Sequence, residues 1–433
     1  MSLFLQTSNS KHFVEHHHCY FEDIANEIDV PKLPQPILFL QNEKAVCFEI
    51  NVHTRRIQTN YYIGVDWIIE KEKAIYVEPK LNKNSKEQTD YLKMLFSALK
   101  HPEVAKHTYD LFEIKWEKTP IAITQEQDLL SPLLVVQYLR LVKEIVRKGL
   151  KKSYYKVENN LYAKVKGKVL VSQTIKQNLV KNKPLHTYCS YDEFGLNSLE
   201  NRLLKKALVF VQRYLPTIKN LQNEKYTTEI FNYINPAFEF VSDEVNLHDV
   251  KHTKTNAFYK EYDEAIKLAK LILKRFGYNI TNTQQKTIKT PPFWIDMSKL
   301  FELYVLGLLK DAYGSHALYG GKEAKLSYGL PDYLITKDGI KCIADAKYKT
   351  LYNEKGQYDI DNIRQLSAYA RDKKVFSKLD INEKEIIDCL IIYPLIDQSS
   401  ILDFKIDFEC FEEVDPFVGF KKIGVPIPII NKI

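Results

Sequence analysis

Two short runs in the last third of the chain carry residue types that can bind a divalent cation and cleave a phosphodiester. They are 329–336, with sequence GLPDYLIT, and 343–349, with sequence IADAKYK, and each predicts a β-strand. An Asp-Gly pair between them predicts a hairpin. Because side chains alternate along a strand, Asp345 and Lys347 share one face, which Asp332 on the partner strand can reach. The sequence therefore predicts that two carboxylates and an ammonium converge.

This combination of groups suits phosphodiester hydrolysis. Carboxylate oxygens are the ligands that Mg²⁺ prefers, and Mn²⁺ can substitute for it. The metal polarises the phosphoryl oxygen and activates the attacking water. A neighbouring lysine orients that water or stabilises the charge that develops on the phosphate. We therefore expect Asp332 and Asp345 to be metal ligands and Lys347 to be catalytic. The alternative is a surface hairpin with scattered charges.

The segments on either side of the hairpin carry further polar candidates. Upstream, 295–309 has helical periodicity, and Glu302 interrupts its apolar residues. Downstream, 359–371 predicts a second helix, on which Gln365 and Tyr369 lie one turn apart on the same face. Glu302 is a further acid for the site or a solvated residue at a helix edge. Gln365 and Tyr369 support the site or only pack on the helix.

The order of these elements resembles a known nuclease fold. Helix, hairpin and helix are followed by a buried strand predicted over 386–394. This order, with Pro-Asp before the hairpin turn and Asp-x-Lys after it, resembles the αββαβ core of PD-(D/E)xK, restriction-endonuclease-like enzymes. In such folds the first helix offers an acid to the metal site, a role that falls here on Glu302. The pair Gln365 and Tyr369 resembles the RecB-like branch, in which it supports the site or positions DNA.

Four motifs narrow the resemblance further. They are Leu300-Phe301-Glu302, Pro331-Asp332, Asp345-Ala346-Lys347-Tyr348-Lys349 and Gln365-x-x-x-Tyr369. Together they resemble McrC, the nuclease subunit of McrBC-type, modification-dependent restriction systems. The resemblance implies a Mg²⁺-dependent endonuclease that cuts modified double-stranded DNA in host defence. It also implies a partner, a McrB-like AAA+ GTPase hexamer that translocates DNA and whose GTP hydrolysis this chain stimulates.

The whole chain predicts a mixed α+β protein with several domains. It has 433 residues, of which 45% are hydrophobic and 12% aromatic, so a packed globular fold is expected. We expect a strand-rich N-terminal domain at 1–120, a mainly helical middle region at 121–285 and the nuclease domain at 290–433. Glu78-Pro79-Lys80 also resembles McrC N-terminal regions, which in that family engage the McrB ring.

Local patterns predict the individual elements of the first two regions. The expected strands are 36–40, 45–50, 61–65, 74–80 and 164–171. The expected helices are 90–99, one from Ser131-Pro132 to Gly149, one capped by Asn197 with Glu200 and running to about 215, and 262–276, ended by Gly277. The polar segment 279–292 is the predicted linker.

Composition limits the classes of partner and compartment. A net charge of +7 is compatible with a polyanion but is weak support for one. Six scattered cysteines without a C-x-x-C pair argue against disulfides or zinc and fit a reducing cytoplasm. No signal sequence and no membrane-spanning run are expected. The run Glu15-His-His-His-Cys19 invites a metal site, but adjacent residues cannot easily form one, so a solvated or packed segment is expected.

Two absent motifs shape the functional prediction. The chain has no G-x-x-x-x-G-K-[ST], so it is not expected to bind a nucleotide. It also has no recognisable helix-turn-helix or zinc finger, so the choice of DNA should lie in another chain. Two alternatives stay open: a self-sufficient PD-(D/E)xK nuclease of repair or recombination, and a non-enzymatic activator of an NTPase ring.

Overall fold

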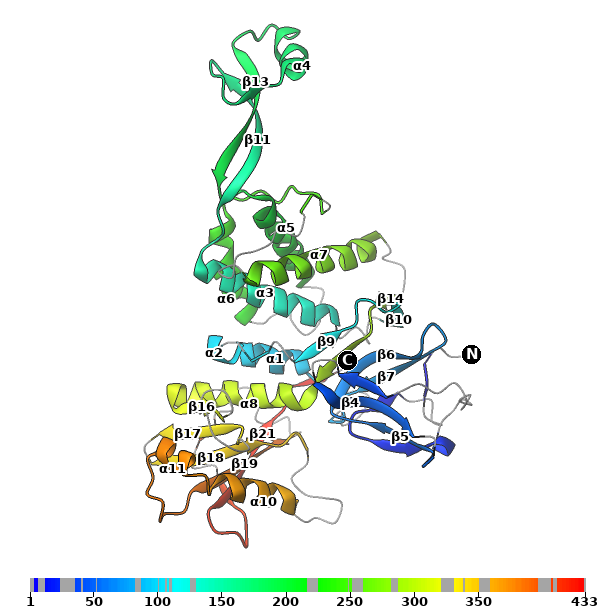
Figure 1. Cartoon of the computed structure of the whole chain (residues 1–433), viewed down its shortest axis with the longest axis vertical. Helices are drawn as coiled ribbons and strands as arrows, with labels where there is room; N and C mark the ends of the chain where they lie inside the picture. The colour runs from blue at the N-terminus through cyan, green and yellow to red at the C-terminus, as the bar shows by residue number, and fades with distance from the viewer. Residues whose placement is uncertain are drawn as a thin grey trace. The chain divides into compact units, whose positions relative to one another are not determined.

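A computed structural model gives the fold of the chain (Figure 1). The residues that it describes are 4–6, 12–23, 36–39, 42–51, 53–81, 87–99, 101–105, 107–108, 111–124, 130–215, 225–247, 249–250, 260–281, 287–320, 331–337, 339–349, 359–395, 406–407 and 411–431. Contacts divide the chain into two compact units, one of residues 1–130 with 286–433 and one of residues 131–285. The three-part division expected from the sequence stays a prediction.

The protein is a mixed α+β protein, as the sequence predicts. Among the described helices, none is both long and apolar enough to cross a membrane.

The N-terminal part of the first unit is built on two sheets. One has the strand order β1-β7-β6-β15-β9 and the other the order β2-β5-β4-β3. Their strands are β1 Phe13–Val14, β2 His18–Tyr20, β3 Ile37–Phe39, β4 Asn42–Asn51, β5 Arg56–Thr59, β6 Tyr62–Ile69, β7 Lys73–Glu78, β9 Phe112–Ile114 and β15 Phe293–Asp296. The four strands predicted before residue 81 are thus confirmed as β3, β4, β6 and β7, and the predicted helix at 90–99 is α1, Tyr91–Leu99.

Strand β15 joins the N-terminal sheet to the elements of the candidate site. It lies between β6 and β9, with Trp294 opposite Gly64 and Glu113. The helix predicted over 295–309 therefore begins later, as α8, Met297–Tyr313, because Ile295 and Asp296 still belong to the strand. The Asp296 side chain caps this helix by accepting a hydrogen bond from Lys299 N at 2.9 Å.

The predicted linker at 279–292 was also wrong in part. Residues up to 281 belong to helix α7, Lys260–Thr281. A short strand, β14, Thr287–Thr290, then pairs with β10, Ile121–Thr124. Polar composition did not exclude pairing here, because a two-stranded ribbon can keep one face in solvent.

The C-terminal part of the first unit is a six-stranded sheet in the order β16-β17-β18-β19-β21-β20. The strands are β16 Ala317–Tyr319, β17 Tyr333–Lys337, β18 Ile340–Ala346, β19 Asp388–Leu395, β20 Glu412–Glu413 and β21 Phe420–Pro426. The predicted hairpin is β17 and β18, antiparallel with Tyr333 opposite Ala344, and Gly339 in its turn has φ +82°. Asp338, Gly329 and Leu330 lie outside the described residues. β18 then pairs in parallel with β19.

Helices lie on both faces of this sheet (Figure 1). α8 packs over one face, and α10, Ile360–Tyr369, with α11, Lys373–Leu379, over the other. Because side chains alternate, Leu334 and Ile343 point into the apolar core under α10 and α11. Tyr333 points to α8, where its hydroxyl donates to the backbone oxygen of Glu302 at 2.6 Å.

The second unit combines helices with a long hairpin. Its main elements are α3 Leu130–Lys148, β11 Ser153–Tyr162, β12 Lys168–Val169, α4 Val171–Thr174, β13 His186–Gly195, α5 Leu199–Tyr214, α6 Lys225–Ile234 and α7. β11 and β13 pair along ten residues each and extend away from the helices (Figure 1). Sequence reasoning missed this hairpin because its connection is a helical module rather than a short turn.

Several local predictions for this unit need correction. The strand expected over 164–171 is reduced to β12, since Val171 already begins α4. Helix α7 continues through Gly277, because a helix tolerates one glycine at a cost of about 1 kcal/mol. The cap of α5 is Ser198, which accepts from Asn201 N at 3.4 Å. Asn197 instead accepts from the Arg202 side chain and from Ser242 N, at 3.0 and 2.9 Å.

Candidate functional site

The candidate site lies where β18 leaves its partner β17. Asp345 is the penultimate residue of β18 and is 2% exposed. Its Oδ2 atom makes no hydrogen bond but forms an ion pair with the ammonium of Lys347. Lys347 lies just past the strand, and its backbone N–H donates to Ile392 O of β19 at 2.8 Å. The predicted proximity of Asp345 and Lys347 is therefore present.

A chain of side-chain contacts continues from Lys347 to α10. Lys347 Nζ donates to Gln365 Oε1 at 2.9 Å, and Gln365 Nε2 donates to the Tyr369 hydroxyl at 2.8 Å. The i to i+4 spacing on the helix makes the second contact possible, as predicted. The structure thus joins Asp345, Lys347, Gln365 and Tyr369 in one continuous network.

Asp332, directly before the partner strand β17, reaches the same place. Its Oδ2 atom accepts a hydrogen bond from Ala346 N at 2.8 Å, so its carboxylate lies beside the end of β18. Burial raises the pKa of Asp332 well above its usual range, and the nearby carboxylates of Asp345 and Glu302 raise it further. The hydrogen bond from Ala346 and the charge of Lys347 oppose this rise only in part. The carboxylates of Asp345 and Glu302 are therefore both close enough to Asp332 to repel a negative charge on it.

Glu302 projects from the second turn of α8 and already has partners. Its carboxylate forms an ion pair with Lys299 at 3.3 Å and accepts a hydrogen bond from the Tyr319 hydroxyl. Sequence reasoning missed Lys299 and Tyr319, although a lysine three residues before a glutamate on a helix is a recognisable pairing signal. To bind a metal, Glu302 would have to exchange these contacts.

The donor set at this place fits a cation that keeps most of its own water. Asp332 and Asp345 supply hard oxygen atoms, and their repulsion favours a divalent charge between them. In the part of the chain that the structure describes, no three His, Cys, Asp or Glu side chains form a ready metal cluster. Mg²⁺ suits such a site because it is commonly held by one or two carboxylates plus water and phosphate oxygens.

The segment after β18 is also tied to α10. Lys349 forms an ion pair with Asp359, whose side chain caps α10 by accepting from Asp361 N at 3.1 Å. This contact orients the helix that presents Gln365 and Tyr369. The sequence signal for Asp359, an aspartate directly before a helix, was available but was not used for the site.

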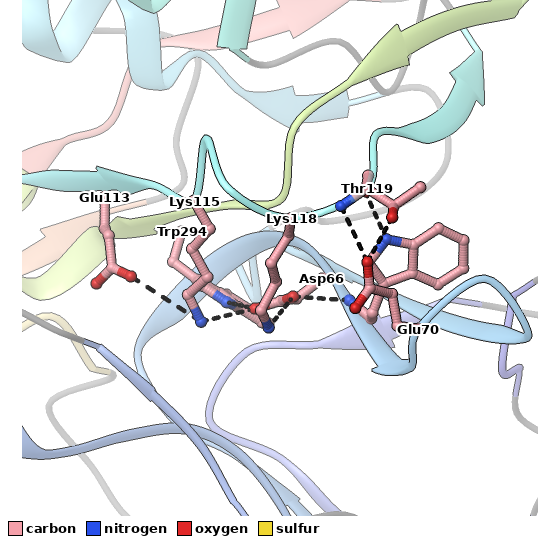
Figure 2. Close-up of polar contacts among 8 residues, drawn as sticks. Asp66, Glu70, Glu113, Lys115, Lys118, Thr119 and Trp294 are labelled. Atoms are coloured by element: carbon pink, nitrogen blue, oxygen red, sulfur yellow. Dashed lines mark hydrogen bonds and ion pairs between the residues drawn. The ribbon is translucent and has the colours of Figure 1, made fainter.

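A buried ion-pair network around Asp66 contacts β15, the strand that leads into α8 (Figure 2). Asp66 on β6 is 0% exposed and is paired with Lys115 at 2.7 Å and Lys118 at 3.1 Å. It also accepts a hydrogen bond from Trp294 Nε1 at 3.0 Å. Trp294 lies on β15, directly before the start of α8, so Asp66 links the N-terminal sheet to the helix that carries Glu302. No local pattern in the sequence indicates this network.

The run from Glu15 to Cys19 is a packed and partly solvated segment, as expected. His16, His17 and His18 are exposed, whereas Glu15 and Cys19 are buried. Burial raises the pKa of Glu15 to about 7, against the opposing charge of Lys80. The carboxylate of Glu15 accepts a hydrogen bond from Lys80 N at 3.1 Å.

The raised pKa of Glu15 predicts a pH-dependent cost. Because the folded state holds this proton more tightly than the unfolded state, its stabilising contribution is complete below the unfolded pKa of 4.5 and is lost as pH rises through about 7. The free energy of unfolding of wild type should therefore fall by about 1 to 3 kcal/mol between pH 5 and pH 8 relative to that of Glu15→Gln, which lacks this carboxyl group. Urea unfolding at both pH values measures this difference. An equal pH dependence in both proteins would contradict it.

With this geometry in view, comparison with known proteins places the chain. The family model described as "McrBC 5-methylcytosine restriction system component" matches residues 57–379. The chain belongs to the McrBC family. The matched range covers most of the chain and includes the candidate residues Glu302, Asp332, Asp345, Lys347, Gln365 and Tyr369. The family resemblance expected from the motifs is thus confirmed.

Two solved structures are similar to this McrBC family member, and both are from Thermococcus gammatolerans. One is a half-complex from a tetradecameric assembly of McrB AAA+ hexamers with bound McrC. It is 17% identical and covers 96% of this chain and 94% of that chain, with a TM-score of 0.36. The other is an McrBC complex, 16% identical, covering 69% of this chain and 86% of that chain, with a TM-score of 0.29. No curated protein matches the chain.

Proposed function

We propose that this McrBC family member is the Mg²⁺-dependent DNA endonuclease subunit of a restriction system. The observation that carries the proposal is the continuous network from Asp345 through Lys347 and Gln365 to Tyr369, with Asp332 beside it. Two acids and a lysine at one end of a hairpin are a set that phosphodiester hydrolysis uses and that a purely structural hairpin does not need.

We assign the six-stranded sheet with α8 and α10 to a PD-(D/E)xK core. The elements occur in the order helix, hairpin, helix, strand, which supports this assignment. The Pro-Asp motif lies directly before β17, and the Asp-x-Lys motif lies at the end of β18. Both motifs therefore meet at one end of the hairpin.

Each residue then has a distinct task. Asp332 and Asp345 would hold the metal, which would polarise the scissile phosphate and activate the attacking water. Lys347 lies against Asp345, where its ammonium orients that water or stabilises charge on the phosphate. Gln365 keeps the ammonium in place and Tyr369 keeps Gln365 in place, so this pair positions Lys347 or the DNA backbone. Glu302 is the further acid that α8 offers to the site.

The partner we propose is a McrB-like AAA+ GTPase hexamer, and the substrate is modified double-stranded DNA. The family description names a 5-methylcytosine restriction system, and a similar structure is described as McrC bound to McrB AAA+ hexamers. The N-terminal region, 1–120, is the part expected to engage and stimulate that ring. The chain itself has no phosphate-binding loop motif, so GTP hydrolysis falls to the partner.

The decisive experiment is reconstituted DNA cleavage. Wild-type protein and Asp345→Ala are each incubated with Mg²⁺, alone and with the McrB-like partner plus GTP, on methylated and unmethylated DNA. We expect cleavage of methylated DNA only with wild type, partner and GTP together. Cleavage by the chain alone would instead indicate a self-sufficient nuclease. Stimulated GTP hydrolysis without any cleavage would indicate a non-enzymatic activator.

A further inference from the structure

We propose that Lys80 is a positioning residue for the nuclease motif: its ammonium, which comes from the N-terminal sheet, fixes the segment Lys347–Lys349. The catalytic part of this inference rests on the proposed function, because it concerns the placement of Lys347. No motif or spacing in the sequence links Lys80 to the site, since the two lie far apart in the chain.

Lys80 contacts both the backbone and the ring of Tyr348. Its Nζ atom donates a hydrogen bond to the backbone oxygen of Tyr348. The same atom lies 4.3 Å from the centroid of the Tyr348 ring and 4.3 Å from that of Tyr61. A cation between two aromatic faces is attracted by both rings. One ammonium therefore holds Tyr348, the residue next to Lys347, by two contacts, and a third contact ties the same ammonium to Tyr61.

Local structure places Lys80 where it can make these contacts. Strand β7 ends at Glu78, and Pro79 has no N–H with which to extend the pairing. Lys80 then turns toward Glu15, which follows β1, the parallel neighbour of β7, and accepts its backbone N–H. The carboxylate of Glu15 offsets the cost of burying an ammonium nearby, although burial still lowers the pKa of Lys80 to about 8.

Tyr348, the residue after Lys347, packs in turn against α8. It is 3% exposed, and its ring lies 5.7 Å from that of Phe301 on α8, the residue before Glu302. Lys349, the next residue along the chain, forms an ion pair with Asp359, the N-cap residue of α10. The segment has left β17, since the last residue of β18 that pairs with that strand is Ala344. Lys80 thus adds support where ladder hydrogen bonds to β17 have ended.

The test compares three variants in the reconstituted complex under single-turnover conditions. Lys80→Met removes the charge and the donor, and should lower the cleavage rate constant roughly 10- to 100-fold with unchanged DNA affinity, because small displacements of a catalytic group are costly. Lys80→Arg keeps the charge, a donor and ring stacking, and should recover most of the rate. Lys71→Met changes an exposed lysine in the turn after β6 and should behave as wild type.

Hydrogen exchange supplies a readout that does not need nuclease activity. In Lys80→Met, the amides of Lys347 and Lys349, which donate to Ile392 O and Lys347 O, should exchange faster than in wild type or Lys71→Met. Unchanged exchange and an unchanged rate in Lys80→Met would overturn the proposal. So would a rate loss that Lys80→Arg does not recover while both variants stay folded. If wild type itself fails to cleave, the proposed function falls, and exchange still decides whether Lys80 holds the segment.

Discussion

Asp345→Asn should lower Mg²⁺-dependent DNA cleavage by at least about 10³-fold, equivalent to about 4 kcal/mol of transition-state stabilisation. Asparagine has nearly the same shape, so the buried end of β18 should keep its packing. What is lost is the negative charge that attracts the cation and pairs with Lys347. Single-turnover cleavage in the reconstituted complex, measured over a range of Mg²⁺ concentrations, gives the size of the effect.

Two controls make the result of Asp345→Asn specific. Stimulation of GTP hydrolysis by the partner should stay at the wild-type level, because the substitution leaves residues 1–120 unchanged. Asp361→Asn removes an exposed carboxylate of α10 and should cleave DNA as wild type does. A rate for Asp345→Asn within tenfold of wild type would show that the metal site lies elsewhere.

Asp66→Ala should destabilise the first unit by about 3 to 5 kcal/mol, because it removes the nearer of the two acidic partners of the buried Lys115 ammonium. The side chain of Lys115 is 8% exposed and that of Asp66 is 0% exposed, so water cannot readily replace the lost carboxylate. The indole N–H of Trp294 also loses its acceptor. Urea unfolding followed by tryptophan fluorescence suits the test, because all three tryptophans, Trp67, Trp116 and Trp294, belong to this unit.

Matched variants separate this buried network from an ordinary ion pair. Glu383→Ala breaks an exposed pair with Lys373 in the same unit and should cost less than about 1 kcal/mol. The double variant Asp66→Ala with Lys115→Met removes the buried ammonium of Lys115 as well, and should recover part of the lost stability. Equal losses for Asp66→Ala and Glu383→Ala would mean that burial of the network contributes little.

The corrected elements show where local reasoning fails. Gly277 looked like a helix end, but α7 continues through it, because packing of a long helix can outweigh the preference of one residue. The start of α8 was misplaced since 293–296 pairs with β6 and β9, two strands more than 170 residues away in sequence. The hairpin of β11 and β13 was missed because 23 residues separate its two strands.

The sequence by itself determined that Asp332, Asp345 and Lys347 lie close together and that Gln365 and Tyr369 are neighbours on one helix. These relations follow from hairpin pairing and helix spacing, which act over a few residues and leave a readable pattern. Only the tertiary structure decided that Lys80 contacts Tyr348 and that Asp66 accepts a hydrogen bond from Trp294, on the strand before α8. Such contacts join segments whose separation along the chain carries no periodic signal, so they exist only once the sheets and helices have packed.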